Sequence, residues 1–249
     1  SFIKAISKLM TEYKNLLKEH NIPLENEAPI TMGMWIGGDR DGNPYVTAET
    51  LKLSAMKQCD LITNYYLNKL DNLYRTFSMS SQLIGESEAL RELANKSLDL
   101  SEYREKEFYR KAIYYVRCKL ENTREYLLND TIHGDIYLSA EDFEKDLKIM
   151  EKSLLENKGE ILITGEFEEL LNVVKIFGFY LASIDMRQDS SVHEACVAEL
   201  LKCANIEQNY NSLSEEEKCK LLLRQLNEDP RPLSIGDDSR QSEELKKEL

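Results

Sequence analysis

Residues 35–47 constrain the fold of this chain more than any other stretch. They read Trp-Ile-Gly-Gly-Asp-Arg-Asp-Gly-Asn-Pro-Tyr-Val-Thr. Glycines, a proline and charged side chains stand so close together here that neither a packed helix nor a central strand would accept them. A short apolar run, Met34-Trp35-Ile36, comes just before, and Thr47 is of a type that caps helices. The sequence therefore predicts a strand, a polar functional loop and then a helix.

Two chemistries and one structural interpretation remain open for this loop. Asp39, Asp41 and Asn43 alternate as at the start of a calcium-binding EF-hand loop, but Pro44 stands where that motif requires glycine. Alternatively, the loop presents Arg40 and backbone donors to an anion, and the carboxylates fix the arginine. In the structural interpretation the turn is bonded only to itself, and Asp39 and Arg40 hold each other.

A second informative stretch covers residues 176–194. Its segment from Phe179 to Met186 is short and apolar, which predicts a buried strand. Arg187 follows at once, and an arginine at the end of a buried strand is costly to desolvate unless it meets an anion. The structural interpretation is that Arg187 pairs with Asp185 or Asp189.

The next helix is predicted to begin directly after this arginine. Ser190 or Ser191 could cap it, and the helix would carry His193 near its start. A histidine at a helix start is more simply explained by a hydrogen bond to a neighbour than by catalysis, so we assign His193 no catalytic role.

Both stretches together resemble the phosphoenolpyruvate carboxylase family, in particular its bacterial members. The family carries a Trp-x-Gly-Gly-Asp-Arg-Asp-Gly-Asn-Pro motif, which is matched here from Trp35 to Pro44. It also carries an Ile-Asp-Ile-Arg-Gln-Glu-Ser motif, matched from Ile184 to Ser190 with Met for Ile and Asp for Glu. The spacing between the motifs suits the family, and so do the flanking residues 2–17, 213–217 and 231–233.

The resemblance implies an enzyme that joins phosphoenolpyruvate to bicarbonate, giving oxaloacetate and phosphate with Mg²⁺ or Mn²⁺. Arg187 inherits a role in holding the substrate phosphate, and Trp35 lies at the phosphorylated-ligand site. Asp39, Arg40 and Asn43 are carried over as loop residues of the active site. The resemblance also implies a cytoplasmic, allosteric, homotetrameric enzyme that supplies the tricarboxylic acid cycle by fixing carbon dioxide.

The chain is nevertheless expected to be one internal helical piece, residues 1–249, of a longer enzyme. The family's Thr-Ala-His-Pro motif, which supplies the catalytic histidine, does not occur in the sequence. The metal-binding carboxylates lie downstream in the family. We therefore expect this chain alone to be inactive, to bind no metal, and to carry part of the substrate-phosphate site, with the rest of the parent chain as its partner. The alternative is a non-catalytic helical interaction or scaffold module that kept the fold.

Composition excludes several other classes. A net charge of −13 argues against binding to nucleic acid or to an acidic membrane surface. Hydrophobic residues make up 42% and charged residues 31%, which argues against disorder. No apolar window approaches the roughly 18 residues of a membrane span. The five cysteines contain no C-x-x-C pair, so neither a zinc site nor a disulfide framework is indicated.

The predicted fold class is mainly α, with long helices and two short strands. The resemblance equates these strands with the first strands of a (β/α)8 barrel. Apolar residues recur at helical spacing, and capping signals precede several of the segments. Helices are predicted over residues 2–16, 48–74, 87–94, 102–128, 139–155, 166–177 and 214–226.

Overall fold

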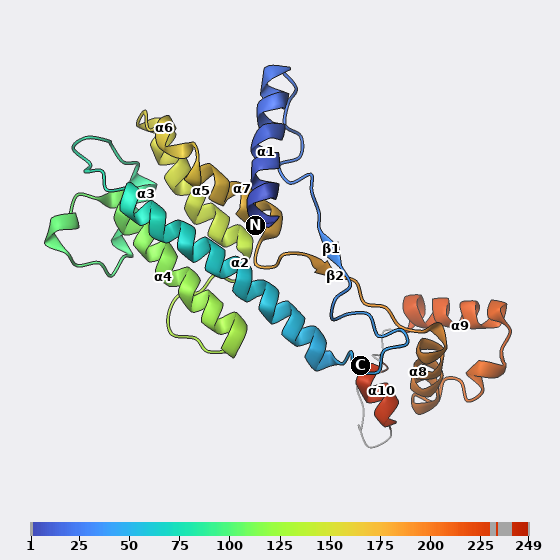
Figure 1. Cartoon of the computed structure of the whole chain (residues 1–249). Helices are drawn as coiled ribbons and strands as arrows, with labels where there is room; N and C mark the ends of the chain where they lie inside the picture. The colour runs from blue at the N-terminus through green and yellow to red at the C-terminus, as the bar shows by residue number, and fades with distance from the viewer. Residues whose placement is uncertain (1, 230–232, 234–240, 249) are drawn as a thin grey trace. The chain divides into compact units, whose positions relative to one another are not determined.

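The structure is a computed structural model that describes residues 2–229, 233 and 241–248. Arg231 and Pro232, which belong to the flanking residues that resemble the family, lie outside the described residues. Helices dominate the described part of the chain, and β1 (Gly33–Met34) and β2 (Ser183–Ile184) form a two-stranded parallel sheet (Figure 1). The predicted class, mainly α with two short strands, is therefore confirmed.

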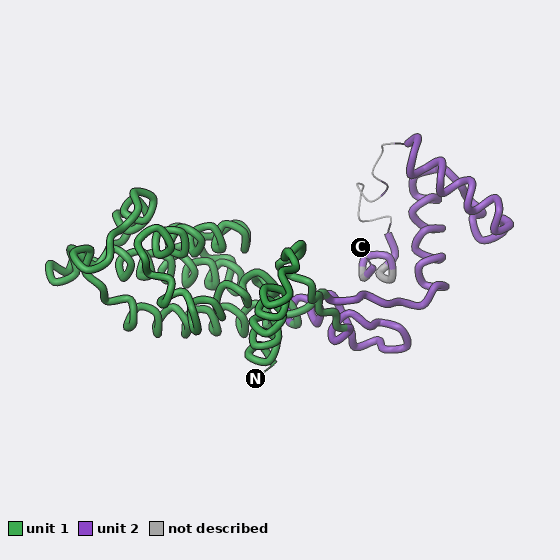
Figure 2. The backbone as a smooth tube through the Cα atoms, turned by 90° about the horizontal axis from the view of Figure 1, so that it is seen from above, with its two compact units in different colours: residues 1–34, 54–183 green, residues 35–53, 184–249 purple. Residues whose placement is uncertain are grey.

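The chain forms two compact units, each built from two separate segments. Unit 1 consists of residues 1–34 and 54–183, and unit 2 of residues 35–53 and 184–249 (Figure 2). The glycine-rich loop and the segment that carries Arg187 both belong to unit 2. The candidate site can therefore be described within this unit alone.

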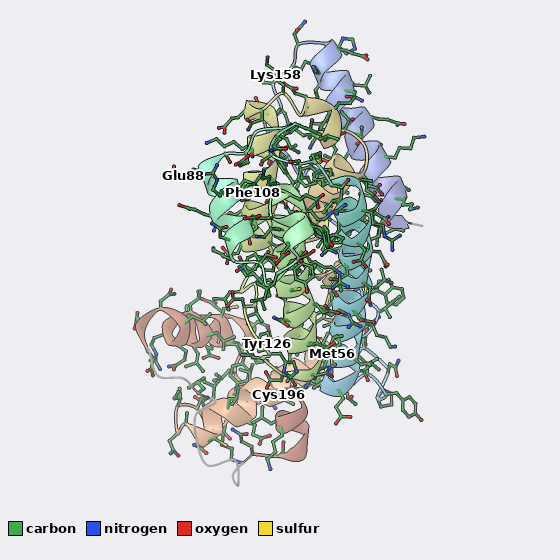
Figure 3. All side chains as sticks on the ribbon, turned by 90° about the vertical axis from the view of Figure 1, so that its left-hand side faces the viewer. Met56, Glu88, Phe108, Tyr126, Lys158 and Cys196 are labelled. Atoms are coloured by element: carbon green, nitrogen blue, oxygen red, sulfur yellow. The ribbon has the colours of Figure 1, made fainter. Side chains whose placement is uncertain are left out.

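Unit 1 is a helical bundle. Its elements are α1 (Phe2–Glu19), α2 (Ala48–Thr76, which begins in unit 2), α3 (Glu88–Asn95), the 3-10 turn η1 (Glu102–Arg104), α4 (Phe108–Asn129), α5 (Ala140–Glu156), α6 (Glu160–Ile163) and α7 (Glu166–Phe177). Phe108 and Tyr126 lie toward the two ends of α4 in Figure 3. Serine caps open α3 and α5, where Ser87 accepts from the N–H of Leu90 and Ser139 from that of Asp142. These caps agree with the predicted helix starts.

The core of unit 1 draws on the apolar faces of α2, α4, α5 and α7. Tyr66 on α2 and Phe143 on α5 are fully buried, and their ring centroids lie 5.5 Å apart. Other buried side chains recur at helical spacing: Ile62, Leu70 and Leu73 on α2, Ile113, Val116 and Leu120 on α4, Leu147 and Met150 on α5, and Phe167, Leu170 and Val173 on α7. None of the described helices is long and apolar enough to cross a membrane.

The predicted start of the helix over residues 102–128 is wrong. The chain makes only the short turn η1, and α4 begins at Phe108. The Lys106 carbonyl accepts the N–H of Ser81 at 2.8 Å, a bond to a distant loop. A continuous helix would use that carbonyl for the N–H four residues ahead, so the tertiary contact interrupts the helix.

The predicted buried strand from Phe179 to Met186 is also wrong in extent and in burial. Only Ser183 and Ile184 are in strand conformation, and Met186 is 69% exposed. The backbone N–H groups of Leu181 and Ala182 donate instead to the side-chain oxygen of Gln58 on α2. Among the described residues β1 and β2 pair only with each other, whereas longer parallel strands are normally buried within larger sheets.

Unit 2 contains α8 (Ser190–Cys203), the 3-10 turn η2 (Tyr210–Ser212), α9 (Glu215–Glu228) and α10 (Glu243–Glu248). A full capping box between Ser214 and Glu217 opens α9, as the sequence predicts. Lys218 on α9 pairs with Glu194 on α8 and lies over the Tyr210 ring, which ties these elements together.

Candidate functional site

The two motifs of the sequence meet in unit 2 through their backbones. The Arg187 N–H donates to the Gly38 carbonyl at 2.9 Å, and the Arg40 N–H donates to the Arg187 carbonyl at 2.8 Å. These bonds form a parallel bridge between Asp39 and Arg187. Segments almost 150 residues apart in the sequence are therefore paired in a defined register.

Gly38 permits this close pairing. A Cβ added at this position would lie 2.5 Å from the Asp185 carbonyl oxygen and 2.8 Å from the Ile184 Cγ2. The first contact is to backbone, which cannot rotate away. The turn before the bridge also needs Gly37, whose φ is 88°, and the turn after it needs Gly42, whose φ is 66°. The glycines of the motif therefore serve a turn, a close approach and a second turn.

The register determines which side chains share a face. Partners in a parallel bridge project to the same side, and the next residue on each strand projects to the other. Asp39 and Arg187 therefore share one side, and the Arg187 guanidinium lies over the Trp35 ring, 5.6 Å from its centroid. We call Trp35, Asp39 and Arg187 the front face. Trp35 is 56% exposed and Arg187 is exposed, so these two side chains of the front face are open to solvent.

No ion pair joins Arg187 to Asp185 or Asp189 among the residues that the structure describes. Asp189 instead caps α8, because its carboxylate accepts from the backbone N–H and the hydroxyl of Ser191. The sequence suggested Ser190 or Ser191 as the cap of this helix. The structure shows that the cap is Asp189. The Ser191 hydroxyl and backbone bonds hold the pKa of Asp189 below its usual range.

Asp39 carries a carboxylate oxygen that is buried beside the bridge. Its Oδ1 atom is buried and has no hydrogen-bond partner in the described part of the chain. A single carboxylate oxygen is a poor metal site, and no group of three His, Cys, Asp or Glu side chains in that part could hold a metal ion. The described residues therefore do not fit the metal of the resembling family, and no chemical step follows from one here.

Arg40 lies on the opposite side of the bridge. Its Nη1 donates to Glu248 Oε2 on α10 at 2.9 Å, and Gln188 Nε2 donates to Glu248 Oε1 at 2.9 Å. We call Arg40 and Gln188 the rear face. The Arg40 and Glu248 side chains are only 16% and 17% exposed, so the pair is largely shielded from water. Glu248 stands 60 residues after Gln188, and no sequence pattern marks it as part of this site.

Asn43 acts within the loop. Its side-chain oxygen accepts the N–H of Tyr45 at 3.1 Å, and its own N–H donates to the Arg40 carbonyl at 3.0 Å. Thr47 then caps α2, with its hydroxyl accepting the Thr50 N–H at 3.3 Å, as predicted. Of the predicted site residues, the structure therefore brings Trp35, Asp39 and Arg187 together, places Arg40 behind them and uses Asn43 to shape the turn.

An exposed guanidinium supported by an aromatic ring is suited to bind phosphate or carboxylate, because its planar donors match those anions. The pairing of both motifs places this guanidinium on a loop of defined register. The family model described as phosphoenolpyruvate carboxylase matches residues 1–249, the whole chain. The chain therefore belongs to the phosphoenolpyruvate carboxylase family.

Proposed function

We propose that this chain carries part of the substrate-phosphate site of a phosphoenolpyruvate carboxylase. The parent enzyme would join phosphoenolpyruvate to bicarbonate and release oxaloacetate and phosphate. The observation that carries the proposal is the exposed Arg187 guanidinium held over Trp35 by the register of the two motifs. Family membership supports the reaction, and this geometry supports the role of the arginine.

Each of the predicted site residues would have a distinct part in binding. Arg187 would donate two parallel hydrogen bonds to phosphate oxygens. Trp35 would limit the rotation of the guanidinium and exclude water from one side of it. Asp39 would accept a hydrogen bond on the same face, whereas Arg40 and Asn43 would hold the loop in shape. The Mg²⁺ or Mn²⁺ of the parent would be held by residues other than those described.

The positive charge of the proposed site is local, because the chain that surrounds it is acidic. The chain as a whole carries a net charge of −13, so a phosphorylated anion gains no general attraction from the protein. Binding must come from local contacts, and Arg187 provides such a contact. A cytoplasmic, homotetrameric parent supplying oxaloacetate to the tricarboxylic acid cycle is part of the same proposal.

A titration of Trp35 fluorescence with phosphoenolpyruvate tests the proposal. Trp35 is the only tryptophan, so the signal reports on the front face alone. We expect a saturable change in the wild type, its loss in Arg187→Ala, and its retention in Arg224→Ala. The last variant removes an exposed arginine from α9 in the same unit and is the matched control.

Two outcomes would contradict the proposal. An unchanged affinity in Arg187→Ala would show that this arginine does not hold the phosphate. The absence of any saturable change in the wild type would show that the chain forms no phosphate site by itself. The latter result would favour the alternative of a helical interaction or scaffold module.

A further inference from the structure

Helix α10 is anchored at both of its ends within unit 2. Before its first turn, the backbone N–H and the hydroxyl of Ser242 donate to the carboxylate of Glu199 on α8, at 2.6 and 2.7 Å. The Ser242 hydroxyl also accepts the N–H of Leu245, whose side chain is fully buried. At the other end, Glu248 binds Arg40 and Gln188.

These contacts close a ring of elements. Helix α8 begins directly after the Arg187 segment, and α10 lies beside α8 (Figure 1). The carboxylate of Glu248 then returns from α10 to the paired motifs. The paired motifs are thus connected to α10 by two routes, one through the α8 backbone and Glu199, the other through Glu248.

The contact of Glu248 with the rear face differs from an ordinary surface ion pair in burial and in the number of its hydrogen bonds. Both carboxylate oxygens are used, one by a guanidinium and one by an amide, and the pair is largely buried. Removal of one partner from such a pair leaves a buried charge without compensation. By contrast, the side chains of Lys220 and Glu216 on α9 are 73% and 79% exposed, and pairs of that kind contribute little.

The rear face is connected to the front face through the backbone. The Arg40 N–H donates to the Arg187 carbonyl, and Gln188 is the next residue after Arg187. Glu248 therefore accepts hydrogen bonds from one side chain of each paired segment, Arg40 and Gln188. Both lie at the bond between the Arg40 N–H and the Arg187 carbonyl. Loss of the carboxylate would remove this shared acceptor and weaken the support of the two register bonds.

We propose that Glu248 is a positioning residue, which binds Arg40 and Gln188 on the rear face and thereby fixes the register that holds Arg187 over Trp35. No motif contains this residue, and it does not touch the front face. Its effect on phosphoenolpyruvate affinity rests on the proposed function, whereas its effect on the register does not.

Amide hydrogen exchange in the intact chain measures the register directly. The Arg40 and Arg187 N–H groups make the two register bonds, and both can be followed by NMR. In Glu248→Ala we expect exchange at these two amides to become roughly tenfold faster or more, since the local opening free energy falls. Glu248→Gln, which keeps a hydrogen-bonding oxygen but loses the charge, should lie between. Glu216→Ala, which removes an exposed carboxylate from the same unit, should leave both amides unchanged.

A reversal of charge separates positioning from a general loss of structure. Arg40→Glu combined with Glu248→Arg restores an ion pair with the opposite sense, so protection of the Arg187 amide should recover in part relative to either single variant. General unfolding of unit 2 would instead accelerate exchange throughout α8 in Glu248→Ala. Unchanged exchange at both amides in Glu248→Ala, exchange accelerated equally throughout α8, or no recovery in the double variant would overturn the role of Glu248.

The same variants distinguish the two proposals from each other. Faster exchange in Glu248→Ala, together with a wild type that does not bind phosphoenolpyruvate, would leave the positioning role standing and remove the proposed function. If binding depends on Arg187 but exchange is unchanged in Glu248→Ala, the proposed function stands and the positioning role is removed. If both stand, Glu248→Ala should weaken phosphoenolpyruvate binding severalfold in the Trp35 titration.

Discussion

At the residue scale, Gly38 decides whether the two motifs can pair. Its Cα faces the backbone of the partner segment, so the space that a side chain would need is taken by the Asp185 carbonyl. The charged and hydrogen-bonding groups of the two motifs can come together only if Gly38 packs closely against the Asp185 carbonyl. The absence of a side chain at Gly38 is therefore a steric requirement of the site.

Gly38→Ala should disrupt the bridge between Asp39 and Arg187. The added Cβ would meet a backbone oxygen at 2.5 Å, so the strands must separate. We expect faster exchange of the Arg187 amide, altered Trp35 emission and loss of phosphoenolpyruvate binding. Gly33→Ala is the control, because a Cβ there meets nothing within 4 Å. Equal behaviour of the two variants would show that steric fit at Gly38 does not govern the pairing.

The carboxyl of Asp189 gives a prediction about pH. Hydrogen bonds from Ser191 lower its pKa, so its contribution to the start of α8 is complete above the ordinary aspartate value of about 3.9 and is lost as the pH falls through the lower, folded value. In Ser191→Ala the pKa of Asp189 should rise toward its ordinary value, because the hydroxyl donor is gone.

A carboxyl NMR titration measures this pKa directly. Ser190→Ala removes the adjacent hydroxyl, which does not contact Asp189 among the described bonds, and should leave the pKa of Asp189 where it is. A pKa that does not move in Ser191→Ala would mean that the hydroxyl bond does not form in solution.

At the element scale, a side chain of α2 binds the backbone donors just before β2 begins. Gln58 is only 6% exposed, and its oxygen accepts the N–H groups of Leu181 and Ala182 at 3.0 and 2.7 Å. Those N–H groups would otherwise need a neighbouring strand. One polar side chain on a helix therefore replaces the hydrogen bonds that a neighbouring strand would provide. This contact helps to keep β2 short.

Gln58→Leu should destabilise unit 1 by about 1–3 kcal/mol, because two backbone donors lose their acceptor while the apolar volume is nearly kept. Urea unfolding followed by circular dichroism measures the change in the free energy of unfolding. Gln82→Leu makes the same chemical change at an exposed position and should have little effect. A loss no larger than that of the control would indicate that water satisfies both donors.

At the scale of the whole molecule, binding of the substrate must be distinguished from its conversion to oxaloacetate. We predict that this chain alone releases no oxaloacetate from phosphoenolpyruvate and bicarbonate in the presence of Mg²⁺ or Mn²⁺. The reason lies in the sequence, since the family's Thr-Ala-His-Pro motif does not occur in it. An assay coupled to NADH oxidation measures the product. Turnover that is abolished in Arg187→Ala would contradict the prediction, because it would show a complete active site.

Local features of the fold could be predicted well. The bounds of α7 and the caps of α3, α5 and α9 follow from apolar spacing and from serine, aspartate and glutamate at fixed offsets. Such features depend on residues within a few positions of one another. The start of α4 and the extent of β2 could not be predicted in this way. Each depends on a bond to a distant segment, from Ser81 in one case and to Gln58 in the other.

The same distinction holds at the site. The sequence by itself determined the family, the helical class and the two motifs, because those are properties of residue types at fixed spacing. Only the tertiary structure decided that Trp35, Asp39 and Arg187 share one face while Arg40 turns to the other and meets Glu248. A shift of one residue in the pairing would exchange these faces, and neither motif encodes its register relative to the other. That register depends on the close approach at Gly38 and on contacts between segments far apart in the chain.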